Sequence, residues 1–168
     1  NKKKEFDNKG QWAKKGKINE ELLNEFKKDV YFKRQPPKST GTDYFNLKWI
    51  KERISNYNKL ISSTDIQATL TELTADIICT SIKECPKNAS IAFCGGGTKN
   101  NLLMRSIQEK LNNKIYLTTD WGIDSKWVEA AGFAYLSKKR IDTVYSDLRL
   151  VTGSDAPIML GGIFLPPK

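Results

Sequence analysis

Three consecutive glycines, Gly95 to Gly97, follow the short apolar run 89–94 and precede two asparagines, Asn100 and Asn101. Glycines leave room for a phosphate group or a flat ring to approach the backbone, and a helix that starts behind them offers free N–H groups and partial positive charge. An asparagine at this position caps the helix or donates to a ligand oxygen. The stretch therefore predicts a phosphate site, a nucleoside site or a plain turn with an asparagine cap.

The spacing of these glycines excludes the two common nucleotide motifs. A phosphate-binding loop of the Walker type needs GxxxxGK followed by Ser or Thr, and the dinucleotide fingerprint needs GxGxxG. Gly95 and Gly97 supply two positions of the second motif, but Asn100 stands at the third. Asp120, the acidic residue nearest to the ribose-binding position, lies too far along the chain. We therefore expect no dinucleotide-dependent oxidoreductase.

Histidine is absent from the chain, and its three cysteines, Cys79, Cys85 and Cys94, have no CxxC spacing. The composition excludes every histidine-based triad, general base and common zinc site among these residues. An odd number of cysteines favours a reducing cytoplasm. We expect the thiols to pack rather than to react, and we predict no metal-ligating residue.

Basic residues outnumber acidic ones by 28 to 19, which gives a formal net charge of +9. Such an excess raises the question of a nucleic acid, an anionic membrane or an anionic small molecule as partner. The lysines lie in scattered groups between Glu and Asp residues, however, which favours a solvated surface. The four tryptophans form no recognisable base-stacking motif. A basic, non-enzymatic nucleic-acid-binding module is kept only as the alternative function.

Length and composition predict the unit that must position the glycines. With 168 residues, of which 39% are hydrophobic, the chain is long enough for one packed domain and too short for two large ones. The apolar runs 89–94 and 158–165 fall well short of the roughly 20 residues that cross a bilayer. The N-terminus has no apolar core of a signal peptide. We expect a soluble, cytoplasmic protein that does not bind membranes.

Apolar residues at helical spacing predict five helices. Pro36, Pro37 and Gly41 cannot continue a helix and predict an ordered loop or extended arm over 31–45. The expected helices are 20–28 with Asn19 as cap, one around 47–54 with Asn46 as cap, a long one through 66–82 with Ser63 or Thr64 as cap, 100–111, and an Ala-rich one within 124–140 with Asp124 as cap.

Three apolar runs, 89–94, 114–119 and 158–165, predict strands that alternate with these helices. This alternation is typical of an α/β layer fold in which helices connect parallel strands. In such sheets the ligands gather at the carboxyl ends of the strands. The glycines lie at one such end.

Six blocks of the chain together resemble the C-terminal half of the anhydro-N-acetylmuramic acid kinase family, bacterial sugar kinases of the actin, hexokinase and heat-shock ATPase superfamily. They stand in the family's order and cover nearly all of the chain. The separation of the PPKSTG and GGG blocks is the most specific part of the resemblance. The blocks are FDNKGQWAKKGKIN (6–19), YFKRQPPKSTG (31–41), DIQATLTELTA (65–75), CGGGTKNNLLM (94–104), TTDWGIDSKWVEAAGFAYL (118–136) and VTGSDAPIMLGGIF (151–164).

The resemblance implies a ribonuclease-H-like, actin-like ATPase lobe with a mixed sheet and flanking helices, and ATP in a cleft between two lobes. In the family an aspartate activates water to open the ring of anhydro-N-acetylmuramic acid. The freed hydroxyl takes the γ-phosphoryl group of ATP with help from Mg²⁺, which gives N-acetylmuramic acid 6-phosphate in peptidoglycan recycling. The resemblance also implies a homodimer.

Two family motifs have no counterpart here, namely the first phosphate-binding loop (GTSxDG type) and the stretch that holds the catalytic aspartate (GFDTGPGN type). We therefore expect residues 1–168 to form a single C-terminal, nucleotide-binding lobe without its N-terminal lobe. We expect no catalytic residue in this chain and no kinase activity from it alone.

The resemblance assigns roles to five residues. Gly95, Gly96 and Gly97 match the superfamily's adenosine-binding turn, with Asn100 as a polar contact or cap. Glu129 matches a family glutamate that faces the anhydro sugar, and the alternative for it is an ordinary surface position. Gly132 stands where the resemblance leads us to expect Ala. Glycine loosens a helix, so this difference bears on the packing of the helix rather than on a ligand contact.

Three other polar positions receive weaker predictions. Lys38, with Ser39 and Thr40 beside it, binds phosphate or belongs to a loop that packs across the lobe. Asp7 and Asp120 are acidic residues near family-like glycines, but neither lies in the catalytic motif. We assign no catalysis to them.

Overall fold

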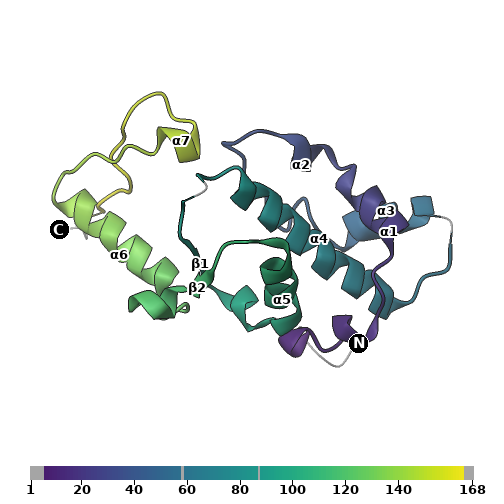
Figure 1. Ribbon diagram of the computed structural model, residues 1–168. Coiled ribbons are helices and arrows are strands. Elements are labelled where there is room, and N and C mark those ends of the chain that lie inside the picture. The colour runs from purple at the N-terminus through teal and green to yellow at the C-terminus, as the bar shows by residue number, and fades with distance from the viewer. Residues whose placement is uncertain (1–5, 58, 87, 165–168) are drawn as a thin grey trace.

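The computed structural model describes residues 6–57, 59–86 and 88–164. The scattered lysines include Lys2 to Lys4, and these lie outside the described residues, as does Leu165, the last residue of the expected strand 158–165. Figure 1 shows a helical body around α4, a small sheet beside it, and α6 and α7 beyond the sheet. The α-helices are α1 (Glu20–Lys27), α2 (Val30–Lys33), α3 (Leu47–Tyr57), α4 (Ser63–Lys83), α5 (Asn101–Lys110), α6 (Val128–Ile141) and α7 (Arg149–Thr152). The strands are β1 (Ile91–Phe93) and β2 (Ile115–Leu117), and the 3₁₀-helices are η1 (Asn8–Gly10), η2 (Ala13–Lys15), η3 (Gly96–Lys99) and η4 (Thr118–Trp121).

Capping residues start four of the five predicted helices close to the expected positions. The prediction for the fifth is wrong, because α6 begins at Val128 after Trp127 without a side-chain cap, and Asp124 accepts from Lys126 N in the turn before it. The Asn19 side chain accepts a hydrogen bond from Leu22 N at 2.9 Å and caps α1, and Asn46 accepts from Trp49 N at the start of α3. The long helix α4 is capped by Ser62, whose hydroxyl accepts from Asp65 N, rather than by Ser63 or Thr64. The predicted loop over 31–45 begins with a short helix, α2, because Asp29 caps it.

The core forms where α4 packs against its neighbours. One cluster joins α1, α3 and the first half of α4 around the buried residues Leu22, Phe26, Trp49 and Leu73. A second cluster joins the second half of α4 to α5 and the sheet around Ala75, Cys79, Ile107 and Leu111. Because Ile91, Phe93 and Ile115 pack against this second cluster, α4 and α5 cover one face of the sheet.

Two parallel strands make up the sheet in the described residues. Ile91 pairs with Ile115 and Phe93 with Leu117, and α5 forms the crossover between the strands. The α/β class and two of the three predicted strands are therefore confirmed. The third strand is wrong over 158–164, where the only ladder contact is one antiparallel bridge between Ile158 and Ser146. Its run contains Gly161 at φ +81° and Gly162, which interrupt an extended strand.

An ion-pair network connects α1, α4 and α5. Lys110 Nζ contacts Glu72 and lies 2.8 Å from Asp76 Oδ1, and Lys27 Nζ lies 2.5 Å from Asp76 Oδ2. Burial by itself lowers the pKa of Lys110, but the hydrogen bonds to Asp76 and Glu72 outweigh it and hold that pKa above its ordinary value. The network therefore stabilises the docking of α5 on α4.

Replacing Lys110 by Met lowers the free energy of unfolding by about 3 kcal/mol at neutral pH, because two half-buried carboxylates lose their shared cation. Burial raises the pKa of Asp76, but hydrogen bonds from Lys110 and Lys27 hold it below its ordinary value. The stabilisation is thus complete above that ordinary pKa and is lost as pH falls through the lowered one. Urea unfolding should show a smaller difference in the free energy of unfolding between Lys110→Met and wild type in acid than at neutral pH. The same difference at both pH values would contradict this role of the ion pairs.

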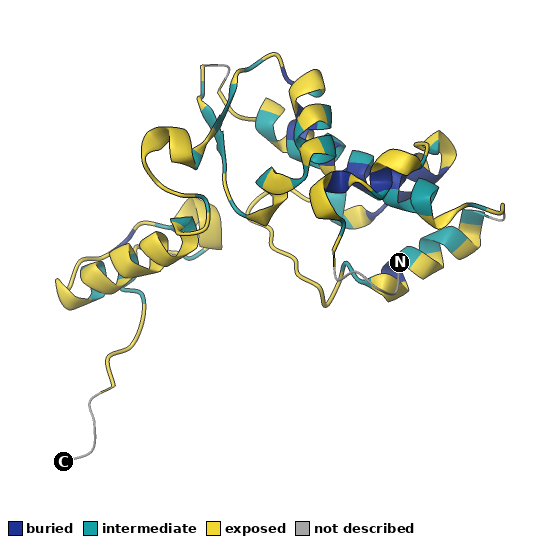
Figure 2. Cartoon of the chain, turned by 90° about the horizontal axis from the view of Figure 1, so that it is seen from below, coloured by how far each residue is buried: buried dark blue, intermediate teal, exposed yellow. Residues whose placement is uncertain are grey.

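The C-terminal part presents many apolar side chains to solvent. Helix α6 has no buried residue, and Figure 2 shows it exposed along its length while the buried positions gather around α4. We call the exposed apolar residues of 121–164 the C-terminal apolar surface; they are Trp121, Ile123, Trp127, Phe133, Tyr135, Ile141, Val144, Tyr145, Leu150, Val151, Ile163 and Phe164. Soluble monomers rarely expose so many large apolar groups together.

None of the helices in the described ranges is long and apolar enough to cross a membrane.

Candidate functional site: an open glycine turn

The glycine turn connects the carboxyl end of β1 to the start of α5. Gly95 has φ +81° and ψ −176°, a conformation that is essentially restricted to glycine. Gly96 and Gly97 continue into the 3₁₀-turn η3, and neither has a positive φ. The fold therefore requires glycine at Gly95 alone.

Two residues outside the glycines hold the turn in place. Gly95 N donates to Ser125 O at 3.3 Å, which ties the turn to the segment before α6. Thr98 Oγ1 donates to Gly95 O at 2.7 Å, and Thr98 N donates to the same oxygen at 3.3 Å. The turn thus has a definite shape that its own glycines could not impose.

Space beside the turn is open. A Cβ atom added at Gly95 or Gly96 meets no atom within 4 Å, and one at Gly97 meets only Leu103 Cδ2 at 3.9 Å. Glycine lowers stability relative to alanine by about 0.5–1 kcal/mol within regular structure. Neither backbone conformation nor packing therefore requires glycine at Gly96 and Gly97, and both leave open space beside the turn.

Asn100 is the cap of α5. Its Oδ1 accepts a hydrogen bond from Leu103 N at 3.1 Å, and its backbone is extended as an N-cap requires. Gly10, at φ +73°, lies so close that an added Cβ would be 2.3 Å from Asn100 Oδ1. The predicted capping role is confirmed, and a contact with a ligand stays a prediction.

Glu129 lies in the first turn of α6, exposed and without a hydrogen bond or ion pair to any described residue. The bond from Gly95 N to Ser125 O places the segment before α6 directly at the glycine turn. The structure therefore brings the start of α6 to the same end of β1 as the turn. At Gly132 an added Cβ meets nothing within 4 Å, so packing places no demand on that glycine.

The PPKSTG loop contacts both the end of α2 and the residue that follows α7. Lys38 Nζ donates to Arg34 O at 2.8 Å and lies 5.3 Å from the ring centre of Tyr31, so the side chain folds back over the end of α2. Pro37 lies against Gly153, whose added Cβ would come within 3.2 Å of Pro37 Cγ. The loop thus packs against the block 151–164, as one of its two alternatives predicts.

Asp7 and Asp120 both hold backbone. Asp7 accepts from Trp12 N at 2.8 Å and from Ala13 N at 3.0 Å, and Asp120 accepts from Leu117 N at 2.8 Å. In the part of the chain that the structure describes, no three Asp, Glu, Cys or His side chains gather to hold a metal ion. The residues present therefore do not fit a magnesium site made by protein ligands alone.

Sequence reasoning missed three residues at this edge of the sheet. Thr98 shapes the turn through its hydroxyl and Ser125 through its main-chain carbonyl, and neither residue belongs to a local sequence pattern that would identify it. Thr118, at the carboxyl end of β2, has a buried Oγ1 without a hydrogen-bond partner among the described residues. Such a hydroxyl is costly unless something pairs with it, and only the structure places it here.

Two parallel strands connected by a helix define an α/β protein, and in open α/β sheets ligands usually bind at the carboxyl ends of the strands, where the glycine turn follows β1. Residues 1–166 match the model of the family described as anhydro-N-acetylmuramic acid kinase. The chain belongs to the anhydro-N-acetylmuramic acid kinase family.

Curated relatives agree with this assignment. The chain is 39% identical over 166 residues to the anhydro-N-acetylmuramic acid kinase of Sulfurimonas denitrificans, and this alignment covers 95% of this chain and 45% of that protein. It is 37% identical over 168 residues to the anhydro-N-acetylmuramic acid kinase of Pasteurella multocida, an alignment that covers 98% of this chain and 44% of that protein. It is 38% identical over 162 residues to the anhydro-N-acetylmuramic acid kinase of Saccharophagus degradans, and that alignment covers 96% of this chain and 44% of that protein. The chain thus spans under half the length of these relatives, and none of them supports the nucleic-acid-binding alternative.

Proposed function

We propose that this chain is the C-terminal, nucleotide-binding lobe of an ATP-dependent kinase that opens anhydro-N-acetylmuramic acid and phosphorylates it to N-acetylmuramic acid 6-phosphate. The observation that carries the proposal is the open glycine turn, where Gly96 and Gly97 leave space that packing does not require. Its position after β1 fits an adenosine of ATP that lies on the backbone of Gly95 to Gly97. The three free cysteines fit a reducing cytoplasm.

The sugar is proposed to lie beside the start of α6. Glu129 is exposed there, and no described residue neutralises its carboxylate. A carboxylate accepts hydrogen bonds from sugar hydroxyls, which orients the substrate toward a phosphoryl donor held at the glycine turn. In this scheme Glu129 binds substrate and does not transfer the proton.

A second lobe is proposed to complete the cleft. The relatives are about twice as long as this chain, and the C-terminal apolar surface is of the kind that another domain buries. In the described residues each strand of the β1–β2 sheet pairs on one side only. The unpaired N–H and C=O groups of such an edge can pair with a further strand. Further strands on the β1–β2 sheet would give the ribonuclease-H-like architecture. The homodimer stays a prediction.

Mg²⁺ would supply charge neutralisation of the ATP phosphates, which it usually contacts directly together with water. The aspartate that activates water is expected outside these 168 residues. The residues described here therefore contribute binding and orientation to the reaction.

The test is an assay of the full-length gene product with ATP, Mg²⁺ and anhydro-N-acetylmuramic acid, with the product identified by mass spectrometry. The full-length protein should form N-acetylmuramic acid 6-phosphate, and the isolated 168-residue polypeptide should form none. Glu129→Gln should raise KM for the sugar about tenfold and leave KM for ATP unchanged, because it removes a substrate contact.

The matched control for this test is Glu20→Gln, an exposed glutamate in the first turn of α1. It should leave both KM values unchanged. A full-length protein that phosphorylates no anhydro sugar would refute the kinase proposal. If Glu129→Gln changes neither KM, the sugar position is wrong and the kinase proposal still stands.

A further inference from the structure

A basic cavity lies between the segment that follows α2 and the C-terminal half of α4. Its volume is about 960 Å³, which is large enough for a substituted small molecule. Six basic side chains line it, namely Lys27, Lys33, Arg34, Lys38, Lys83 and Lys110, against two acidic ones, Asp76 and Glu84. We call it the basic cavity.

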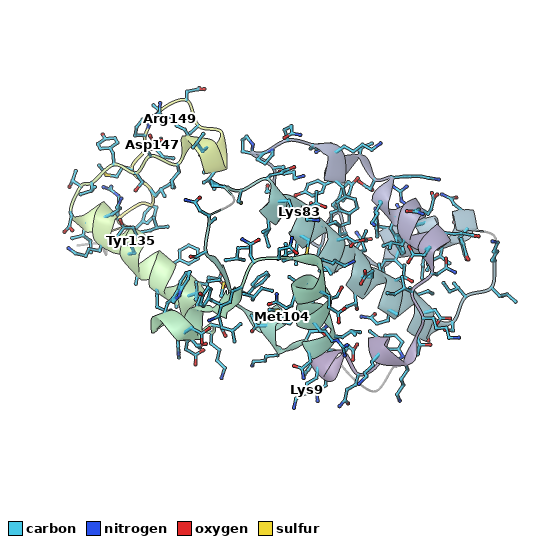
Figure 3. The ribbon with its side chains drawn as sticks, in the orientation of Figure 1. Lys9, Lys83, Met104, Tyr135, Asp147 and Arg149 are labelled. Carbon is cyan, nitrogen blue, oxygen red and sulfur yellow. The ribbon has the colours of Figure 1, made fainter. Side chains whose placement is uncertain are left out.

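Half of these cations already have partners. Lys27 and Lys110 pair with Asp76, and Lys38 donates to the carbonyl oxygen of Arg34. The other three, Lys33, Arg34 and Lys83, form no ion pair with any residue of the described ranges. Lys83, labelled in Figure 3, is the last residue of α4. Lys33 is the last residue of α2, and Arg34 follows it directly.

These three exposed cations line one concave surface and come from two separate elements. Like charges that line the same concave surface repel one another, and their combined field attracts an anion. Phe32 and Ile77 add apolar wall to the same cavity. The lining thus combines uncompensated positive charge with an apolar side against which a ring can pack.

The basic cavity is separate from the glycine turn. It lies along the last turns of α4 and at Lys110, the last residue of α5, and these helices end just before β1 and β2 begin. It is therefore close to the amino ends of the strands, whereas the glycine turn lies at the carboxyl end of β1. A ligand of one site does not occupy the other.

We propose that the basic cavity binds a small molecule that carries a phosphate group, with Arg34, Lys33 and Lys83 around the phosphate. A phosphate monoester carries close to two negative charges at neutral pH and three acceptor oxygens, which suits three unpaired donors better than one carboxylate does. Arg34 supplies the planar fork that phosphate prefers. The proposal goes beyond the kinase function and does not depend on it.

Two cysteines allow the two sites to be observed in one experiment. Cys85 is exposed and lines the basic cavity, and Cys94 is exposed directly before the glycine turn. Cys79 is buried, and its burial raises the pKa of its thiol, so it reacts slowly. The full-length gene product is alkylated with iodoacetamide, and the rate at each cysteine is measured by peptide mass spectrometry.

Inorganic pyrophosphate at millimolar concentration is the first probe. It should slow the alkylation of Cys85 and leave Cys94 less affected, whereas ATP should protect Cys94 if the glycine turn binds nucleotide. Glucose 6-phosphate is the second probe. Stronger protection of Cys85 by glucose 6-phosphate assigns the cavity to a sugar phosphate, and stronger protection by pyrophosphate assigns it to a polyphosphate.

The double variant Arg34→Gln/Lys83→Gln should raise the pyrophosphate concentration needed for half-protection of Cys85 about tenfold, because it removes two charge-assisted contacts. The matched control is Lys14→Gln/Lys51→Gln, which removes the same charge from exposed positions outside the cavity. It should change protection little. Thermal unfolding of both variants establishes that they fold.

Three results would overturn the proposal. The first is no protection of Cys85 by either probe, and the second is equal protection of Cys85 and Cys94 by pyrophosphate. The third is unchanged protection of Cys85 in a folded Arg34→Gln/Lys83→Gln variant. Failure of ATP to protect Cys94 would count against the nucleotide role of the glycine turn and leave the basic cavity untouched.

Discussion

Replacing Asp29 by Ala should lower the free energy of unfolding by about 4 kcal/mol, because it leaves the half-buried guanidinium of Arg53 and the buried indole N–H of Trp49 without their partner. Asp29 is 1% exposed. Its carboxylate accepts hydrogen bonds from Trp49 Nε1 at 2.8 Å, Tyr44 Oη at 2.9 Å and Arg53 Nη2 at 2.8 Å. It also accepts from Tyr31 N at 2.9 Å. One carboxylate thus joins α2, α3 and the loop between them.

Asp29→Asn should destabilise the protein less than Asp29→Ala, because an amide oxygen still accepts from the indole but no longer balances Arg53. Chemical unfolding of both variants at neutral pH measures this order. The control is Asp43→Ala, in which an exposed aspartate of the same segment is removed with a change within about 0.5 kcal/mol. Equal stability of Asp29→Ala and wild type would contradict the role of Asp29.

The contribution of Asp29 also depends on pH. Burial by itself raises the pKa of Asp29, but hydrogen bonds from Trp49, Tyr31 and Tyr44 and the charge of Arg53 outweigh it, so the pKa lies below its ordinary value. A lowered pKa in the folded state means that the stabilisation is complete above the ordinary value and is lost as pH falls through the lowered one. The difference between wild type and Asp29→Asn should therefore be constant near neutrality and shrink in acid.

Replacing Gly96 by Val should weaken ATP binding about a hundredfold, or about 2.7 kcal/mol, while the protein remains folded. The backbone at Gly96 has no positive φ, and an added Cβ meets no protein atom within 4 Å. The new side chain therefore projects into the space that the proposed adenosine occupies. Isothermal titration of the full-length gene product with ATP measures the change.

Gly132→Ala is the control for the glycine turn, because it adds a methyl group at another position with open space. It should leave ATP binding unchanged and stabilise α6 by up to about 1 kcal/mol. Gly95→Ala is expected to destabilise the turn as well, since φ there is +81°, so it does not separate folding from binding. Unchanged ATP affinity in Gly96→Val would place the nucleotide elsewhere.

Local signals in the sequence predicted the elements that are made locally. Asn19 and Asn100 were expected to cap helices and do so, since a cap depends on only three or four consecutive residues. The runs around 91–93 and 115–117 were expected to be strands and are. The run at 158–164 has similar composition but no strand beside it for continuous pairing, so composition alone was insufficient.

The candidate site was predicted in part. The position of the glycines between a strand and a helix follows from the order of residues, and the structure has that arrangement. The open space beside Gly96 and the bond from Gly95 to Ser125 depend on how a distant segment folds back. The roles of Gly95 to Gly97, Asn100 and Glu129 in binding stay predictions.

By itself, the sequence determined the α/β class, the five longer α-helices, the caps of α1, α3 and α5, the place of the glycine turn and, through six ordered blocks, the kinase family. These features depend on neighbouring residues or on their order along the chain. Tertiary structure alone decided that Asp29 joins three segments, that Lys33, Arg34 and Lys83 line one cavity, and that α6 has no buried residue. Such features depend on distances between residues far apart in the chain, which local periodicity and propensity do not specify.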